Sequence, residues 1–334
     1  MINFIFREMT SLKYFLPIVQ EGNRRGIQST FYIEFCKKYN CPSRYVEYLS
    51  KVCQDNEITV KEIDKAHKAE GPTFYCEDSG IGCQNSNYVG KKISLTYQND
   101  FFNESGDTTR YHEYHLKYFD HIIFPSEFFA NFHNCISDKN LYLGCPKYDV
   151  KIDRKQVIEK YNTPEKNNCL VIFPKPRDLG RIDLPKILGW ISSLGYNPIV
   201  KNREKDRIPG VENLNYYFED LSWYPHTTME LLEISDFMVN FGSTTVKEAV
   251  MSRVPLINFP IKPHEKIKTL PFFYEYDYCK TLDPDCDFKS FKLGVEYLTN
   301  KDHKSSFQKS IENHMTLENS SKNIVDFICN SKKV

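Results

Sequence analysis

Short apolar segments alternate with longer segments of helical periodicity along the whole chain. Apolar runs of strand length, such as 2–6, are followed by stretches such as 12–20 that carry apolar residues at helical spacing. This alternation is typical of βα units whose strands form a parallel sheet. The pattern therefore predicts an α/β fold.

The alternation runs through two series of units. In the first series we expect strands at 2–6, 30–33, 73–76, 93–97 and 121–124, and helices at 12–20, 43–52, 111–119 and 126–132. In the second we expect strands at 169–173, 198–200, 215–218, 237–241 and 255–259, helices at 183–194, 228–234 and 246–251, and further helices from Phe288 onward.

A charged, asparagine-rich segment, 151–168, separates the two series and indicates a domain boundary. We expect an N-terminal domain at 1–155 and a C-terminal domain at 166–334 that includes the closing C-terminal helices. Both domains are expected to be Rossmann-like, with their parallel sheets facing across a cleft.

Composition and charge exclude several classes of protein. With 334 residues, 40% hydrophobic and 26% charged, the chain belongs to the soluble globular class. Its 44 basic residues balance its 44 acidic ones, so it has no global positive field for binding nucleic acid. The apolar runs are too short for a membrane span of about 20 residues. Arg7 and Glu8 interrupt the first run too early for a signal peptide, so we expect a cytoplasmic protein.

The 11 cysteines indicate neither a disulfide framework nor a zinc ribbon, because their number is odd and no C-x-x-C occurs. Two other patterns contain residue types that can bind a metal ion. Asp283-Pro284-Asp285 contains D-x-D but lies in a late loop with no convincing strand before it. His112 and His115 are spaced i, i+3 but lack a matched third ligand, so a polar helix surface explains them better. We expect no metal site.

Polar and basic residues follow the strands of the second series. Ligands of open parallel sheets bind beyond the carboxyl ends of the strands, so these residues are candidates for binding. They are Lys175 and Arg177, Lys201 and Arg203, and the run Gly242-Ser243-Thr244-Thr245. We expect all three loops to converge on one edge of the sheet.

The run from Gly242 to Thr245 has the composition of a phosphate-binding turn. Gly242 permits a tight turn after the strand, and the hydroxyls of Ser243, Thr244 and Thr245 come at the start of the next helix. Amides, hydroxyls and the helix dipole together suit a phosphate group. Glu248, one helical turn later, is placed to accept a sugar or ribose hydroxyl. The alternative is that these hydroxyls only cap the helix.

Three segments resemble one family. They are MELLEISDFMVNFGSTTVKEAVMSRVPLINFP at 229–260, LGYNPIVKNREKD at 194–206, and FDHIIFPSEFFANFHNCISDKNLYLGCPKYD at 119–149. In order and spacing they are similar to GT-B-fold glycosyltransferases, nearest to the CDP-glycerol glycerophosphotransferase-like and capsule-polysaccharide transferases. UDP-N-acetylglucosamine 2-epimerases are more distantly similar. The resemblance covers most of residues 110 to 262.

The resemblance implies a hexosyl- or pentosyltransferase. It would move a sugar from a nucleotide-sugar donor, UDP- or GDP-linked, to a glycan or related hydroxyl acceptor, without a metal or cofactor. The basic side chains and helix amides would neutralise the leaving diphosphate. Trp223 or Tyr224 could stack on the base or pack against its own domain. The alternatives are a CDP-linked alditol phosphotransferase, a sugar-nucleotide 2-epimerase and an inactive GT-B scaffold subunit.

The chain departs from the family at two places. Many relatives carry His-Pro after the strand lysine, whereas here Arg203 would have to replace the histidine. Relatives of the glycerophosphotransferase type carry W-H-G-T-P after the fourth strand of the first domain, and that catalytic histidine is absent here. Asp100 is the titratable group at its place, so we expect Asp100 to be the base that activates the acceptor. Glu77 and Asp78 are alternatives from the neighbouring loop, unless they are solvated carboxylates.

Overall fold

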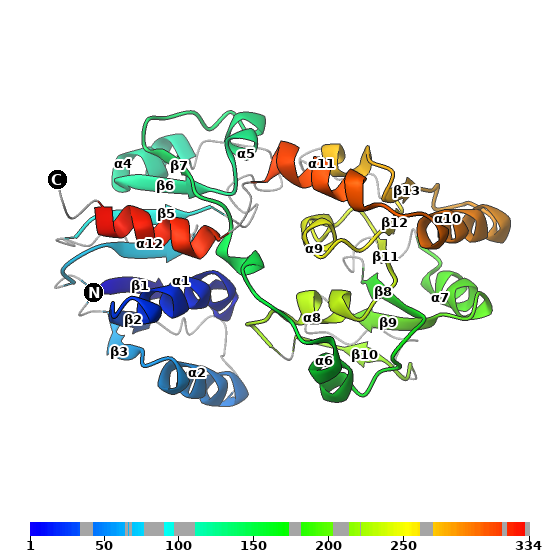
Figure 1. Cartoon of the computed structure of the whole chain (residues 1–334), viewed down its shortest axis with the longest axis horizontal. Coiled ribbons are helices and arrows are strands. Elements are labelled where there is room, and N and C mark those ends of the chain that lie inside the picture. Colours follow the sequence, from blue (N-terminus) through cyan, green and yellow to red (C-terminus); the bar gives the residue numbers. More distant parts are fainter. Residues whose placement is uncertain are drawn as a thin grey trace. The chain divides into compact units, whose positions relative to one another are not determined.

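The computed structural model describes residues 1–33, 43–63, 66, 69–76, 90–96, 111–173, 182–202, 214–220, 222–260, 270–315 and 319–330, without the side chains of 43–45. The chain divides into two compact units (Figure 1). Unit 1 consists of Met1–Val150 and His314–Val334, and unit 2 consists of Lys151–Asn313.

Unit 1 contains a parallel sheet of seven strands in the order β3-β2-β1-β4-β5-β6-β7. The strands are β1 (Ile2–Phe6), β2 (Ser29–Ile33), β3 (Thr59–Glu62), β4 (Thr73–Cys76), β5 (Lys92–Leu95), β6 (His121–Phe124) and β7 (Asn140–Tyr142). The helices are α1 (Leu12–Arg24), α2 (Ser43–Asp55), α4 (Leu116–Tyr118), α5 (Glu127–Phe132) and α12 (Ser320–Asn330). A π-helical turn, Tyr111–His115, leads into α4.

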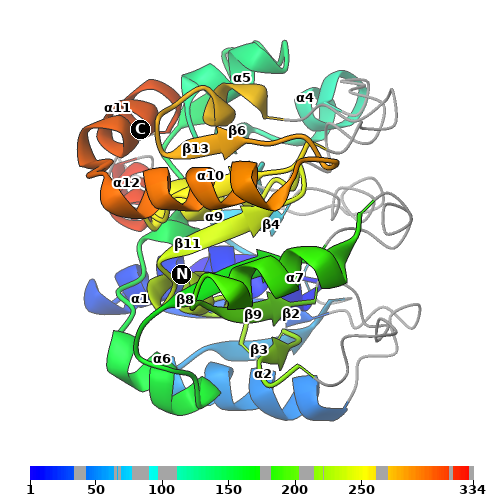
Figure 2. The same ribbon diagram turned by 90° about the vertical axis from the view of Figure 1, so that its right-hand side faces the viewer.

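Unit 2 contains a parallel sheet of six strands in the order β10-β9-β8-β11-β12-β13. The strands are β8 (Asn168–Ile172), β9 (Asn197–Lys201), β10 (Tyr217–Phe218), β11 (Phe237–Asn240), β12 (Leu256–Asn258) and β13 (Cys279–Thr281). The helices are α6 (Arg154–Tyr161), α7 (Leu184–Ser193), α8 (Thr227–Glu233), α9 (Val246–Met251), α10 (Phe288–Asn300) and α11 (Lys304–His314). Figure 2 shows α7 and α10 in front of this sheet.

The two sheets share one strand order. Counted within each unit, the first six strands run 3-2-1-4-5-6, which is the doubly wound Rossmann order. The predicted α/β class with two Rossmann-like parallel sheets is confirmed. In each unit the order reverses between the first and fourth strands, β1 and β4 in unit 1 and β8 and β11 in unit 2. Such a switch point is where open α/β sheets bind their ligands.

The central strands are buried on both faces, which explains their continuous apolar sequences. All five residues of β1 and all five of β8 are buried. In unit 1 the core is largely aromatic, and the Phe4 ring centroid lies 4.9 Å from that of Phe15 and 5.3 Å from that of Phe31. In unit 2 the Phe259 ring stacks between those of Phe241, at 5.7 Å, and Phe291, at 6.3 Å. These cores hold the strand ends in fixed positions.

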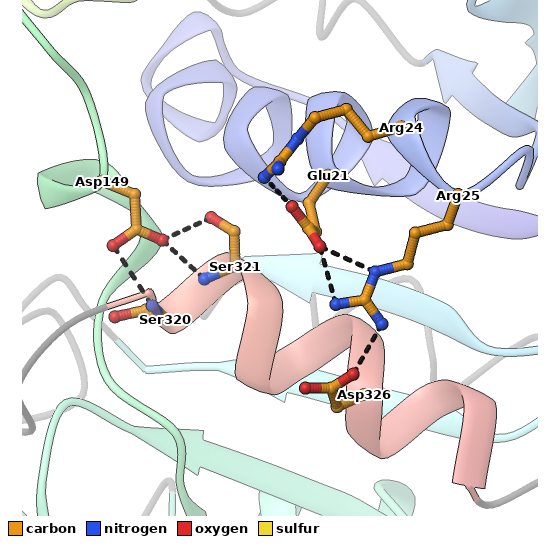
Figure 3. Close-up of polar contacts among 7 residues, drawn as sticks. All are labelled: Glu21, Arg24, Arg25, Asp149, Ser320, Ser321 and Asp326. Carbon is orange, nitrogen blue, oxygen red and sulfur yellow. Dashed lines mark hydrogen bonds and ion pairs between the residues drawn. The ribbon is translucent and has the colours of Figure 1, made fainter.

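The C-terminal helix α12 belongs to unit 1, whereas the sequence analysis assigned the C-terminal helices to the domain at 166–334. The Asp149 carboxylate caps α12, accepting hydrogen bonds from Ser320 N at 3.2 Å and from Ser321 N and Oγ at 2.6 Å each (Figure 3). Arg25, which directly follows α1, donates to Asp326 Oδ1 at 2.6 Å and to the buried Glu21 Oε1 at 2.7 Å. These partners lie far apart in the sequence, so the spacing of apolar residues could not have revealed the docking.

Most of the predicted strands and helices are present, with ends that differ by a few residues. Three strands were not predicted, β3, β7 and β13, and each lies at an edge of its sheet. In the described part of the chain, no helix has the length and apolar character required to cross a membrane.

Candidate functional site

At the switch point of unit 2 the carboxyl ends of β8 and β11 lie side by side, since these strands are parallel neighbours in the sheet. The loop after β11 consists of Gly242, Ser243, Thr244 and Thr245 and leads directly into α9. The carboxyl end of β9 lies on the other side of β8. The predicted convergence of these three strand ends on one edge therefore agrees with the strand order.

Gly242 begins the turn in a conformation that favours glycine. Its φ is +65°, in the left-handed region where a side chain costs roughly 1 kcal/mol or more. Its amide donates a hydrogen bond to Asn258 Oδ1 at 3.1 Å. The backbone is thus fixed immediately beyond the buried strand.

Two buried asparagines stabilise the Gly242–Thr245 loop by hydrogen bonds. Asn240 and Asn258 end β11 and β12, face each other in the sheet register and are 0% and 3% exposed. Asn240 Nδ2 lies 3.2 Å from Asn258 Oδ1, 3.3 Å from the Ser243 carbonyl and 3.1 Å from the Tyr274 hydroxyl. The asparagine pair therefore joins the loop to both strands.

Tyr274 completes this support. Its hydroxyl donates to the Ser243 carbonyl at 3.3 Å. Burial raises the pKa of Tyr274 above its ordinary value, so the group stays protonated and remains a donor. The sequence analysis did not identify Asn240, Asn258 or Tyr274. An asparagine at the end of each of two apolar strands was the available signal.

The loop hydroxyls are not engaged in capping α9. Thr245 occupies the N-cap position but makes no side-chain cap hydrogen bond. Its Oγ1 lies 3.0 Å from Ser243 Oγ, and that oxygen is 3.4 Å from the Thr245 amide, at the weak limit of a hydrogen bond. The half-buried Thr244 hydroxyl has no hydrogen-bond partner among the described residues. These hydroxyls can therefore serve a ligand.

Two amides of the first turn of α9 are already hydrogen-bonded. Val246 N bonds to the Ser243 carbonyl at 3.3 Å, and Lys247 N bonds to the Thr244 carbonyl at 3.2 Å. An anion would therefore meet the amides of the preceding loop rather than those of the helix. Glu248 is half-buried in α9, one turn beyond Thr245.

Lys201 ends β9 and is almost fully buried, at 5% exposed. Its ammonium lies 2.8 Å from Asp220 Oδ1, just beyond β10, and His226 Nε2 lies 3.4 Å from the same oxygen. The positive charge of Lys201 is thus already balanced, which reduces what it can contribute to binding a diphosphate. Neither Asp220 nor His226 was identified from the sequence.

Trp223 and Tyr224 lie in the loop between β10 and α8, and both are half-buried. The Trp223 backbone pairs with that of His226, and the two ring centroids are 5.9 Å apart. Both aromatic side chains therefore belong to a folded loop beside the Lys201 and Asp220 pair.

Six predicted site residues lie outside the described residues: Glu77, Asp78, Asp100, Lys175, Arg177 and Arg203. Strands β4, β5, β8 and β9 end shortly before them. Their roles stay predictions.

Within the described ranges, no three His, Cys, Asp or Glu side chains form a group that could hold a metal ion. Asp283 accepts a turn hydrogen bond from Asp285 N at 2.8 Å.

The interpretation of the histidine pair as a polar helix surface is wrong for His115. His115 is 4% exposed and stacks on Phe119 at 5.2 Å, because the π-helical turn directs it into the core.

Comparison with known proteins supports the architecture. No family model and no curated protein matches the sequence. Among solved structures, the wall teichoic acid polymerase TagF, in a variant soaked with CDPG, has 14% identity and a TM-score of 0.69, with 99% of this chain and 89% of TagF covered. The chain has the GT-B fold.

Two epimerases show the same similarity of fold. A putative UDP-N-acetylglucosamine 2-epimerase from Listeria monocytogenes has 13% identity, a TM-score of 0.64 and coverage of 97% and 94% of the two chains. The UDP-GlcNAc 2-epimerase of Methanocaldococcus jannaschii, solved with UDP-GlcNAc and UDP, has 12% identity, a TM-score of 0.59 and coverage of 98% and 99%. At such identities the likeness establishes the fold alone. The GT-B fold implied by the sequence resemblance is thus confirmed.

Proposed function

We propose that the chain is a glycosyltransferase that moves a sugar from a nucleotide-sugar donor to a glycan or related hydroxyl acceptor. The observation that carries this proposal is the Gly242–Thr245 loop at the switch point of unit 2. Asn240, Asn258 and Tyr274 hold its backbone, while the amides of Ser243 and Thr244 and the Thr244 hydroxyl have no hydrogen-bond partner among the described residues. Preorganised donors of this kind stabilise the charge that develops on a leaving diphosphate.

Each residue near the loop has a role in this proposal. The amides and hydroxyls of Ser243, Thr244 and Thr245 bind the diphosphate, and Glu248 accepts a sugar hydroxyl. Arg203, Lys175 and Arg177 supply positive charge. Lys201 contributes less than the sequence suggests, because Asp220 already pairs with it. Trp223 or Tyr224 receives the base.

A sugar-nucleotide epimerase is the second candidate, favoured by the fold likeness to two 2-epimerases. Because the Methanocaldococcus enzyme was solved with UDP-GlcNAc and UDP, UDP compounds are the first ligands to test on this chain. An epimerase would isomerise a nucleotide sugar without any acceptor, whereas a transferase releases nucleotide only as the acceptor is glycosylated. Transfer from a CDP-linked alditol would instead require a CDP compound.

Replacing Thr244 and Thr245 together by valine is expected to weaken nucleotide binding about tenfold or more, since two hydroxyl donors are lost without a change of shape. Calorimetric titration with UDP, GDP and CDP measures the effect. The variant Thr299→Val, in the same unit but on α10, is the control and should bind like the wild type. Unchanged affinity in the Thr244 and Thr245 variant would contradict the proposed donor site.

We also propose that catalysis needs no metal, with amides and basic side chains taking the place of a cation at the diphosphate. Transfer should therefore persist in excess EDTA, measured as glycosylated product per unit time. Complete loss of activity in EDTA, with recovery on addition of Mn²⁺, would refute metal independence.

A further inference from the structure

Helices α6 and α8 lie beside each other in unit 2 (Figure 1), and side chains near both ends of α6 bind α8. At its start, the Arg154 guanidinium donates to the carbonyls of Glu233 and Ile234, which close α8. At its end, Lys160 and Tyr161 reach Glu230, in the first turn of α8. The two helices therefore run antiparallel, and the position of α8 depends on α6.

Glu230 is the central group of this attachment. Its carboxylate belongs to a residue only 5% exposed and accepts from Lys160 Nζ at 2.8 Å through each oxygen and from the Tyr161 hydroxyl at 2.6 Å. A buried carboxylate is costly unless it is paired and hydrogen-bonded, so these contacts fix the geometry closely. Burial and the Glu230 charge raise the pKa of Tyr161, which keeps the hydroxyl protonated as a donor.

The start of α8 determines the conformation of residues 222–226, which precede it. Thr227 Oγ1 accepts from Ser222 N at 2.9 Å and donates to the Ser222 carbonyl at 3.1 Å, and Ser222 Oγ donates to the Pro225 carbonyl at 2.5 Å. Tyr161 contacts the same helix through Glu230, which lies in the first turn that Thr227 begins.

The residues at the start of the loop 219–226 are attached to strands β9 and β10 of the sheet. Asp220 binds Lys201 at the end of β9, and the Tyr161 ring packs edge-on against Phe218 of β10 with centroids 5.0 Å apart. Tyr161, itself 4% exposed, therefore touches the elements at both ends of the loop that carries Trp223 and Tyr224.

We propose that Tyr161 is a positioning residue for the nucleoside part of the donor: together with Glu230 it sets the conformation of residues 222–226, in the loop that receives the base. This inference rests on the proposed function. The proposed base site differs from the diphosphate site, which lies on the loop after β11. A ligand without a base can therefore distinguish the two sites.

The test compares a nucleoside diphosphate with inorganic pyrophosphate in the Tyr161→Phe variant. The nucleotide used is whichever of UDP, GDP and CDP binds the wild type most tightly, and pyrophosphate is measured by its competition with that nucleotide. We expect the nucleotide Kd to rise about tenfold, in line with the loss of one hydrogen bond to a buried charge. The pyrophosphate Kd should stay within about twofold, because its site on Gly242–Thr245 is unaltered.

Tyr278→Phe is the matched control. Tyr278 is likewise buried in unit 2, and its hydroxyl lies 2.8 Å from Ser310 Oγ. It lies next to β13, which is the edge strand opposite to β10. It should lower the melting temperature much as Tyr161→Phe does, with no change in either Kd. Lys160→Gln changes a half-exposed residue that holds Glu230 from the other side, so it should fold readily and raise the nucleotide Kd to a smaller extent.

The inference is overturned if Tyr161→Phe leaves the nucleotide Kd unchanged, if it weakens pyrophosphate equally, or if Tyr278→Phe gives the same loss. If the wild type binds none of the three nucleotides, the proposed function itself fails, and the inference with it. That result is distinct from an unaffected variant of a nucleotide-binding wild type.

Discussion

Asn258→Leu is expected to lower the free energy of unfolding by about 1 to 3 kcal/mol and to weaken nucleotide binding more than tenfold. Leucine has a similar volume but removes the acceptor of Gly242 N, and it removes one of the three acceptors near Asn240 Nδ2. A donor left without a partner costs roughly 1 to 3 kcal/mol. Chemical denaturation and calorimetric titration measure the two effects.

The loss of binding must be separated from the loss of stability, and Asn168→Leu is suited to this. Asn168 is also a fully buried strand asparagine of unit 2, and its Nδ2 donates to the carbonyls of Pro164 at 2.7 Å and Ile234 at 3.0 Å. It begins β8, at the opposite end of the sheet from the Gly242 turn. Asn168→Leu should destabilise unit 2 to a similar extent with nucleotide affinity retained. Equal loss of affinity in both variants would mean that Asn258 has no specific role in the site.

Asp100→Asn is expected to reduce transfer by roughly 10²- to 10⁴-fold, the usual contribution of a general base. Asparagine keeps the shape and the hydrogen-bonding capacity of the side chain but cannot take a proton. Donor binding, which depends on unit 2 in this proposal, should persist. Single-turnover assays give the rate, and a separate titration gives the donor affinity.

Asp78→Asn and Glu77→Gln are the comparison variants for this prediction. If Asp100→Asn transfers sugar normally while either of these is inactive, the base comes from the loop after β4 instead. Normal rates in all three variants would favour a retaining mechanism without an enzymic base.

The central strands could be predicted from the sequence, whereas three of the four edge strands, β3, β7 and β13, could not. Strands such as β1 and β8 are buried on both faces, so their apolar runs are continuous and easily recognised. All four residues of the edge strand β3 are exposed, and it carries Lys61 and Glu62 in place of an apolar run. β7 and β13 are also edge strands, each of only three residues. An edge strand pairs on one side only, so burial leaves a weaker signal.

In the site, too, local features could be predicted from the sequence, whereas contacts between distant residues could not. The turn at Gly242 is a local feature, and the sequence indicated it through the glycine and the three residues with hydroxyls that follow. The pairing of Lys201 with Asp220, and of Asn240 with Asn258, depends on which strands are neighbours in the sheet. From the sequence, Lys201 at the end of its strand was therefore expected to bind the diphosphate, although in the folded unit its charge is already balanced by Asp220.

The most direct measurement of the central claim is a crystal structure of the chain with a nucleotide sugar or its nucleoside diphosphate bound. We predict that the diphosphate oxygens lie within hydrogen-bond distance, about 2.7 to 3.2 Å, of the amides or hydroxyls of Ser243, Thr244 and Thr245. The carboxyl ends of β8 and β11 would flank the ligand. A diphosphate bound elsewhere on the chain, with the Gly242–Thr245 loop making no contact to it, would contradict the account.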